Sequence, residues 1–402
     1  NILVNMEDKG KQWVLLAAGS KDWINYRHQA DVCDAYQVVH RNGIPDEQIV
    51  VMMYDDIAYN PLNPFPGNII NVPNGPNVYP GVPKDYTGQD VSADNFLAVL
   101  SGNSAAVKKT GPKKVIRSGE NDTIFVYLSD HGGHGIFCFP HSTLHADDLI
   151  KTVHTMAMNH KFSKMVIYIE ACHSGSMLEK LSDINVYAVS ACKPDESSYA
   201  CFLDQKRNAF LADIFSYYWL WSTANGKLST FGDQFSFLLA NVPKDSRNKQ
   251  TPCKYGDNSI LKLMLSGFLG SSASLSKTDM LQPLNVSNMS DLVDTTDVPL
   301  IIQENMIKNE DHPGKKQALK REYDALIRKR KTVDEALQKI AERTNTLGAL
   351  TEKREVSRTY ELKRMAEHFK NELFNWEKEL HVVTRAHFQI LVNFCESGLE
   401  VD

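Results

Sequence analysis

Short runs of apolar, mostly β-branched or aromatic residues recur along the first half of the chain, separated by segments of helical periodicity. Residues 12–19 form a continuous apolar run closed by a glycine, which is typical of a central strand buried on both faces. A helix is predicted over 28–41, because apolar residues recur there at helical spacing and a glycine follows, and a strand over 48–54. Strands and helices that alternate through short links predict an α/β unit built on a mostly parallel sheet.

The same alternation continues toward the middle of the chain. It predicts strands over 123–128, 164–169 and 185–190, and helices over 92–100, 146–158 and 210–222. Residues 60–90 are rich in Pro, Gly and Asn and predict a long loop region. Long loops beside α/β sheets often shape ligand sites.

Two motifs stand where predicted strands end. They are Ser129-Asp130-His131-Gly132-Gly133 and Glu170-Ala171-Cys172-His173-Ser174-Gly175-Ser176. Because the carboxyl ends of parallel strands meet at one edge of a sheet, His131 and Cys172 are expected to lie close together. A thiol, with a free pKa of roughly 8.5, needs a neighbouring base to become a nucleophile. The pair therefore predicts a cysteine hydrolase with Cys172 as nucleophile and His131 as base.

The small residues behind both motifs leave backbone N–H groups sterically open. The amides of Gly132 and Cys172 are predicted to form an oxyanion hole, in which one lost donor raises the barrier by about 3 kcal/mol. A buried cysteine at a strand end is usually inert, and a histidine before two glycines is often a turn residue. The two motifs together favour catalysis.

Two further histidines lie close to these motifs in the sequence. His173 is an alternative base, but it adjoins the nucleophile on an extended segment and is expected to point to the opposite side. His134 is a second alternative, and the sequence does not fix its direction. No HExxH spacing and no CxxC pair occur, so no metal site and no cofactor are predicted.

The cysteines and sequons bear on the compartment. The seven cysteines are spread over the whole chain, and Cys192 and Cys201 could form a disulfide or remain two separate thiols. Sequons at Asn121, Asn285 and Asn288 suggest glycosylation and passage through the secretory pathway. The chain begins at Asn1 rather than Met, so we expect that a signal peptide has been removed. No apolar run reaches the roughly 18 residues of a membrane span.

The composition changes in the last third of the chain. Residues 266–300 are rich in Ser, Asp, Thr and Pro and predict a linker, whereas 315–379 and 385–395 predict a small helical bundle. Residues 312–402 carry a net charge of +3 and residues 1–311 a net charge of −8, so the two parts attract each other. Neither part has the basic stripe of a nucleic-acid-binding protein.

Six segments of the chain resemble the legumain family of asparaginyl endopeptidases, in its animal-type proenzyme form. They are Trp23–Asp31, Tyr54–Ala58, Val82–Gly88, Asp130–Gly133, Glu170–Cys172 and Glu196–Cys201. The resemblance runs continuously over residues 12–265 and more loosely over the helical tail. It implies a caspase-like catalytic domain over 1–265, a linker and activation peptide over 266–311, and a helical prodomain over 312–402, shortened relative to the family.

The resemblance also implies cleavage after Asn, and after Asp at acidic pH. Cys172 would be the nucleophile, His131 the base and Asn25 the residue that orients His131. The specificity pocket would consist of Arg27, His28, Glu170, Ser197, Ser198 and Asp213. An Asn side chain offers a carbonyl to Arg27 and an NH₂ group to acceptors. A substrate with Asp at this position would face the carboxylates of Glu170 and Asp213, so a proton would have to be shared among these groups. A plain structural ion pair of Arg27 with Asp213 is the alternative.

Members of this family are zymogens whose helical part covers the active site and leaves at acidic pH. The charge difference between the parts fits such a latch, which protonation of interface carboxylates would weaken. Activation is expected at Asn309, with Asn305 as the second candidate. The family implies a lysosomal, endosomal or secreted protein that acts on proteins and peptides, with cystatin-type inhibitors as candidate partners. One departure is His173, where relatives commonly carry Glu.

Two other functions are compatible with these residues. A peptide ligase would use the same nucleophile but resolve the acyl-enzyme with an amine instead of water. A catalytically silent binding protein would use the helical tail as its partner surface. The presence of Cys172, His131 and Asn25 argues against the silent protein.

Overall fold

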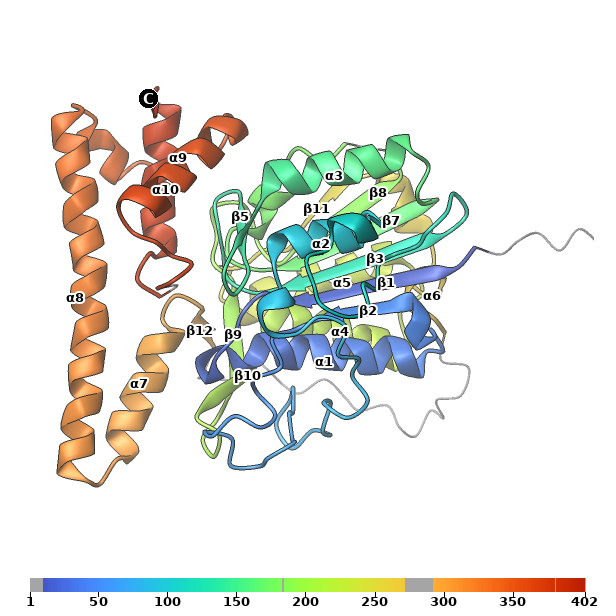
Figure 1. The fold of residues 1–402 in the computed structure, drawn as a ribbon, viewed down its shortest axis with the longest axis horizontal. Coiled ribbons are helices and arrows are strands. Elements are labelled where there is room, and N and C mark those ends of the chain that lie inside the picture. Colours follow the sequence, from blue (N-terminus) through green and yellow to red (C-terminus); the bar gives the residue numbers. More distant parts are fainter. Residues whose placement is uncertain (1–9, 183, 272–291, 380, 402) are drawn as a thin grey trace, which may run out of the picture.

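The computed structural model describes residues 10–182, 184–271, 292–379 and 381–401 (Figure 1). Its centre is a six-stranded sheet in the order β11-β8-β7-β3-β1-β2. The strands are β1 Gln12–Ala18, β2 Ile49–Met52, β3 Thr123–Ser129, β7 Lys164–Glu170, β8 Val186–Ser190 and β11 Cys253–Gly256. All neighbours pair in parallel except β11, which runs antiparallel to β8. The predicted mostly parallel α/β architecture is confirmed.

Helices cover both faces of this sheet. Successive residues of β1 point to opposite faces, so Val14 and Leu16 belong to one core while Leu15 and Ala17 belong to the other. The first core is closed by α1 Tyr26–Arg41, α4 Ile214–Asn225 and α5 Phe231–Asp245, and the second by α2 Ala93–Leu100 and α3 Ala146–Met158. Burial on both faces explains why β1 reads as one uninterrupted apolar run.

Two small sheets lie beside the main one. One has the order β10-β9-β12, with β9 Tyr199–Asp204, β10 Ala209–Asp213 and β12 Val293–Asp294. The other consists of β4 Gly132–Gly133, β5 Ile136–Cys138 and β6 Thr143–His145.

Most predicted elements of the first 200 residues are confirmed within a few residues, but the helix over 210–222 began too early. Residues 209–213 form β10, which pairs with β9, and the helix begins at Ile214. A short apolar run does not by itself distinguish a strand from a buried helix. Pairing with β9 makes residues 209–213 a strand. The predicted strand 48–54 is shortened to β2 Ile49–Met52.

The last part of the chain is helical, as predicted. It contains α7 Val298–Asn309, α8 Pro313–Arg343, α9 Thr359–Glu372 and α10 Arg385–Glu396. The predicted linker 266–300 is not free of structure, because it holds the short helix α6 Ser266–Leu269, β12 and the start of α7. No helix of the described residues is long and apolar enough to cross a membrane.

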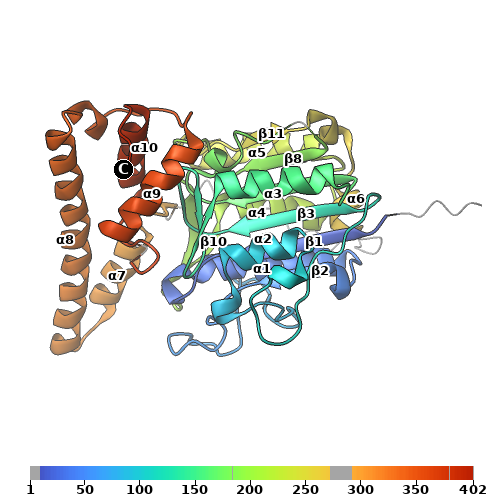
Figure 2. The same ribbon diagram turned by 45° about the horizontal axis from the view of Figure 1, so that its top comes forward.

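Helices α8, α9 and α10 lie beside the edge of the sheet at which β1 ends, in both views (Figures 1 and 2). A third apolar core joins them to the small sheet. It contains Ile136 and Cys138 of β5, Leu337 of α8, Phe388 of α10, and Trp376 from the segment between α9 and α10. The helical part is thus packed on the edge of the sheet where the two sequence motifs end.

Candidate active site

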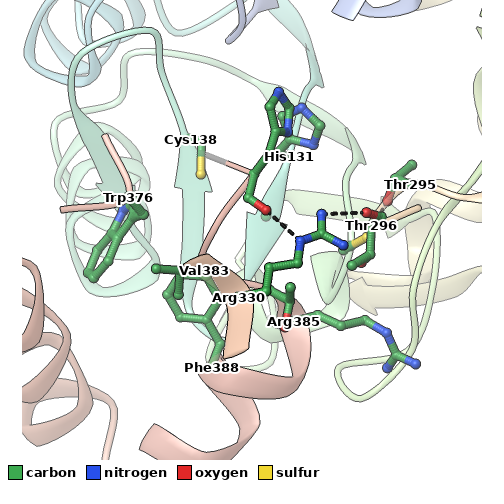
Figure 3. Close-up of a pocket in the computed structure, with 13 residues that line it drawn as sticks. His131, Cys138, Thr295, Thr296, Arg330, Trp376, Val383, Arg385 and Phe388 are labelled. Carbon is green, nitrogen blue, oxygen red and sulfur yellow. Dashed lines mark hydrogen bonds between the residues drawn. The ribbon is translucent and has the colours of Figure 1, made fainter. Parts of the chain in front are cut away.

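The two motifs meet at the carboxyl ends of neighbouring strands. In the parallel pair β3 and β7, Ser129 lies opposite Glu170, so His131 and Cys172 each follow two residues later. Both residues line the same cavity together with Gly132 (Figure 3). The predicted juxtaposition therefore follows from the register of two buried strands.

His131 is oriented by Asn25. Its Nε2 lies 2.7 Å from Asn25 Oδ1, while Asn25 Nδ2 donates to the Lys21 carbonyl at 2.8 Å. Because Asn25 uses its oxygen toward the ring, Nε2 carries the proton and Nδ1 is left as the base. Burial lowers the pKa of His131 well below its ordinary value, and Arg27 and His381 lower it further. The imidazole is therefore neutral and able to accept a proton.

Cys172 is buried and its sulfur has polar neighbours on two sides. The Ser198 N–H points at Sγ from 3.4 Å, and the Ser198 hydroxyl lies 3.5 Å away. The Thr295 hydroxyl lies 2.6 Å from the same sulfur. Burial raises the pKa of Cys172, with a further increase from Asp294, although the hydrogen bonds from Thr295 and Ser198 act in the opposite direction. In this form of the protein the sulfur is a protonated thiol.

Gly132 allows its backbone to approach that of the nucleophile. A Cβ atom at this position would lie 2.5 Å from the Cys172 carbonyl oxygen and 3.1 Å from the Ala171 Cβ. Contacts with backbone atoms at that distance cannot be relieved without moving the chain. The amide of Gly132 is thus held next to Cys172, as an oxyanion donor requires.

Replacing Gly132 with alanine is therefore expected to lower kcat/KM by about 100-fold, because a displacement of about 1 Å in such a site has that effect. The matched control is Gly119→Ala, since a Cβ at Gly119 meets nothing within 4 Å. Peptidase assays and thermal melts of both variants check this. Full activity of a folded Gly132→Ala enzyme would contradict the proposed role of this amide.

A second group of buried polar side chains lies near His131, because His28, whose ring packs on that of His131, lies 3.9 Å from Asp213. Arg27 Nε donates to Asp213 Oδ1 at 2.9 Å, and both side chains are almost completely buried. Glu170 accepts the Ser216 N–H at 2.9 Å and the Ser216 hydroxyl at 3.0 Å, both through Oε2. The Arg27–Asp213 ion pair that was the structural alternative does form.

The ion pair leaves several polar atoms of this group without a hydrogen-bond partner among the described residues. They are Nη1 and Nη2 of Arg27, Oε1 of Glu170 and Oδ2 of Asp213. Buried polar atoms are normally satisfied, so a cluster of donors and acceptors without partners indicates a ligand pocket. Two guanidinium donors beside two carboxylate acceptors complement a primary carboxamide, which carries one carbonyl and one NH₂ group.

Glu170 and the neighbouring Asp31 both have a raised pKa. Burial raises the pKa of Glu170 well above its ordinary value, and the neighbouring Asp213 raises it further. Burial and the neighbouring Asp213 also raise the pKa of Asp31. A proton is therefore shared within this acidic cluster more readily than among exposed carboxyl groups.

The other residues expected in the pocket have different positions. His28 Nδ1 lies 2.7 Å from the Ser20 hydroxyl and 3.2 Å from Asp130 Oδ1, and its ring packs edge-on against His131 at 4.9 Å. It therefore supports the base. Ser198 contacts the thiol, as described above. Ser197 is buried, and its hydroxyl has no hydrogen-bond partner in the described part of the chain.

Among the described residues, one group of side chains could hold a metal ion, namely His28, Asp130 and His131. One ligand atom from each lies within 4.8 Å of the others. His131 is the candidate base, so a cation bound there would compete with proton transfer.

The two alternative bases do not line this cavity. His173 has a left-handed backbone, and its Nδ1 lies 2.7 Å from the Pro194 carbonyl. Its ring packs on that of His134 at a centroid distance of 3.9 Å. Burial lowers the pKa of His173 to about 3. Of these histidines, only His131 lines the cavity with Cys172 in the described part of the chain. His173 points elsewhere, but its backbone is left-handed rather than extended as expected.

Sequence reasoning missed the residues that cover the cavity. Arg330 of α8 donates from Nε to the His381 carbonyl at 2.8 Å and from Nη2 to the Thr296 carbonyl at 2.9 Å (Figure 3). The His381 ring lies 5.5 Å from that of His131. These residues come from the last third of the chain, and no local pattern marks them.

Polar contacts join the helical part to the rest of the molecule around this cover. His145 Nε2 lies 2.7 Å from Glu367 Oε1, Lys363 donates to Asp148 at 2.8 Å, and Thr143 donates to Glu377 at 2.7 Å. The hydrogen bond from His145 lowers the pKa of Glu367 to about 2. That carboxylate therefore stays charged throughout the mildly acidic range.

The remaining predicted sites lie on the surface or outside the described residues. Asn309 is exposed at the end of α7, whereas Asn305 is half-buried within the same helix. Asn121 is exposed in the turn before β3. Asn285 and Asn288 lie outside the described residues. In the described structure Cys192 is a free thiol, so it forms no disulfide with Cys201.

The chain is similar to known peptidases over most of its length. Residues 12–271 match the Peptidase C13 family. The chain is 43% identical to legumain of Pongo abelii over 398 residues, which covers 97% of this chain and 90% of the relative. It is 35% identical to the vacuolar-processing enzyme delta-isozyme of Arabidopsis thaliana, covering 98% of this chain and 88% of the relative. Caspase-1 from Spodoptera frugiperda aligns with 68% of this chain and 94% of its own, at 12% identity and a TM-score of 0.37.

Proposed function

Because this chain belongs to the peptidase C13 family of cysteine endopeptidases, we propose that it cleaves peptide bonds after Asn, and after Asp at acidic pH. The observation that carries this specificity is the pocket of Arg27, Glu170 and Asp213. Its unpartnered atoms are two donors and two acceptors, the complement of a carboxamide.

The proposed reaction begins with proton transfer from the Cys172 thiol to Nδ1 of His131. The sulfur attacks the carbonyl carbon that follows the Asn side chain, and the amides of Gly132 and Cys172 stabilise the oxyanion. His131 then donates its proton to the leaving amine, with Asn25 holding the ring in place. Water hydrolyses the resulting thioester and restores the thiol.

Cleavage after Asp is proposed to require acid for an electrostatic reason. An Asp side chain would bring a third carboxyl group against Glu170 and Asp213, so binding needs a proton in the cluster. The pKa of Glu170 is already raised by burial and by Asp213. Activity after Asp should therefore fall with rising pH, while activity after Asn depends less on this proton.

We further propose that the protein is a zymogen inhibited by its own helical part. Residues 1–265 would be the catalytic domain, 266–311 the linker and activation peptide, and 312–402 the prodomain. The support is that Arg330, His381 and Thr295 all cover the candidate site. Activation would follow cleavage after Asn309, which is exposed at the end of a helix, in preference to Asn305.

Buried histidines support release of this cover by acid. Burial, with added repulsion from Arg330 and Arg27, lowers the pKa of His381 to about 4. Once undocked, the histidine would have its ordinary pKa of about 6.5. The docked state binds fewer protons, so docking weakens as the pH falls from about 6.5 to about 4. The Glu367 carboxylate has a pKa of about 2, so it stops stabilising the docked state only at a pH below this range.

His381→Gln should therefore shift the midpoint pH of release to lower values, because the neutral amide cannot take up the proton. The matched control is His368→Gln, an exposed histidine of the same helical part. Release is followed by size-exclusion chromatography of the cleaved chain across pH 4–7. An unchanged midpoint in His381→Gln would contradict this role.

We propose a lysosomal, endosomal or secreted glycoprotein that acts on protein and peptide substrates. Glycosylation at Asn121 is compatible with its exposure. Cystatin-type inhibitors are proposed as external partners, alongside the chain's own prodomain.

The function is tested with matched peptides that differ only in having Asn, Asp or Gln at one position. After acid treatment of the protein, mass spectrometry is expected to show cleavage after Asn at all pH values from 4 to 6, after Asp only at the acidic end, and not after Gln. Equal cleavage after Gln would contradict the carboxamide pocket. An added amine nucleophile distinguishes hydrolysis from ligation through the mass of the product.

A further inference from the structure

Asp31 lies next to the specificity pocket, on the same face of α1 as Arg27 and about one helical turn further along. Its side chain is completely buried. The Ser129 hydroxyl donates to Asp31 Oδ2 at 3.0 Å, and Asn71 Nδ2 donates to Asp31 Oδ1 at 3.0 Å. Ser129 ends β3 and Asn71 belongs to the loop region over 60–90. Contacts from two other parts of the fold therefore hold this carboxyl group in place.

Asp31 faces Asp213, the ion-pair partner of Arg27. A side-chain hydrogen bond joins the two carboxyl groups. Such a bond needs a proton on one of them, because an ionised carboxylate can only accept. Asp213 Oδ1 accepts from Arg27, whereas Oδ2 has no donor among the described residues as long as both carboxyl groups are ionised. A proton on Asp31 gives Asp213 a further donor.

The buried charges of this cluster do not balance. Asp31, Glu170 and Asp213 are three carboxyl groups around the single guanidinium of Arg27, and all four side chains are almost completely buried. A buried carboxylate without a cation is costly, so the cluster retains a proton more readily than exposed carboxyl groups do. Arg27 pairs with Asp213 and lowers the pKa of Glu170 against the effects of burial and Asp213. Asp31 has only neutral donors on its oxygens and forms no ion pair within the described ranges.

Two other titratable groups face the cluster, and neither adds a charge. Burial raises the pKa of Tyr127 well above its ordinary value, and Asp31 and Glu170 raise it further. Burial also lowers the pKa of His28 well below its ordinary value, with Arg27 as the next cause. The phenol and the imidazole are both neutral in the acidic range. The balance of charge in the cluster therefore depends on its carboxyl groups.

We propose that Asp31 is a positioning residue of the specificity pocket, which takes up the proton that lets the pocket accept an Asp side chain and donates it to Asp213. The inference rests on the proposed cleavage after Asn and Asp. Uptake of a proton from solvent by Asp31 removes one negative charge beside the pocket, so an incoming carboxylate is repelled less. The side chain of an Asn substrate is neutral and does not depend on this charge.

The test is Asp31→Asn in the full chain, treated with acid and with an active protease in trans. The amide keeps the shape of protonated Asp31 and a donor for Asp213, but it cannot become negative as the pH rises. The readout is the ratio of kcat/KM for matched Asp and Asn peptides from pH 4 to 6. The fall of this ratio with rising pH is expected about 1 pH unit higher than in the natural protein, which raises the ratio at pH 6 by about 10-fold.

Ser129→Ala tests the same proton without changing the carboxyl group. It removes a hydrogen bond that favours the ionised form of Asp31, so Asp31 should hold its proton to a higher pH. The fall of the ratio should move in the same direction as in Asp31→Asn, by a smaller amount. A merely structural defect would lower cleavage after both residues and leave the pH of the fall where it is. If thermal melts show that Asp31→Asn does not fold, Ser129→Ala decides alone.

Asp34→Asn is the matched control on the same helix. Burial raises the pKa of Asp34 to about 6, and the charge that opposes this increase is Arg41 at the end of α1, not a residue of the pocket. Its ratio should follow that of the natural protein, and an equal shift in Asp34→Asn would overturn the assignment to Asp31. An unchanged pH of the fall in both Asp31→Asn and Ser129→Ala would overturn it as well. If the natural protein does not cleave Asn peptides, the proposed specificity itself is wrong.

Discussion

Cys172→Ala is expected to lower the hydrolysis of Asn peptides by at least about 10⁴-fold, because no other group can form the thioester. The variant should fold normally. The Cys172 side chain lies at the end of β7, where loss of a sulfur removes one partner of Ser198 and Thr295 without disturbing the strand. The measurement is kcat/KM after acid treatment with an active protease added in trans, so that failure of self-activation does not mimic failure of catalysis.

The matched control is Cys192→Ala. Cys192 is also fully buried and lies close by, with its sulfur 3.3 Å from the Ala171 carbonyl, yet it does not line the cavity. Burial raises the pKa of this thiol well above its ordinary value. We expect activity within a few-fold of the natural protein. If Cys192→Ala and not Cys172→Ala abolished activity, the nucleophile would have been assigned to the wrong strand.

Arg27→Lys is expected to have the second-largest effect, a loss of about 100- to 1000-fold in kcat/KM for Asn peptides. The positive charge is kept, so Asp213, Glu170 and Asp31 are still balanced and the fold is preserved. A single ammonium that pairs with Asp213 does not supply the planar pair of donors that Nη1 and Nη2 offer to a carbonyl. Losing a charged hydrogen bond inside a desolvated site costs roughly 2–5 kcal/mol.

Arg41→Lys is the control for this prediction, because Arg41 lies on the same helix, α1, but is exposed at its end. Its activity should match that of the natural protein. Thermal melts of both variants separate a loss of binding from a loss of fold. Equal activity of Arg27→Lys and the natural protein would show that Arg27 is only the structural partner of Asp213.

The sequence allowed much of the central architecture to be predicted because its signals are local. β1, β3 and β7 are buried on both faces, so they read as apolar runs, and the register of parallel strands then places His131 beside Cys172. The predicted start of α4 was wrong because the apolar run over 209–213 fits a buried strand as well as a buried helix. Pairing with β9 makes this segment a strand.

The pattern of residues specifies the sheet and the edge at which the two motifs end, and the family resemblance supplies the residues expected in the pocket. The cover over these residues follows from tertiary packing alone. Thr295 lies 123 residues from Cys172 in the chain and reaches it through backbone pairing with β9, which any side chain can make. Arg330 and His381 join it through backbone carbonyls, which leave no trace in residue type. Such contacts depend on the docking of helices, and the pattern of residues along the chain does not encode that docking locally.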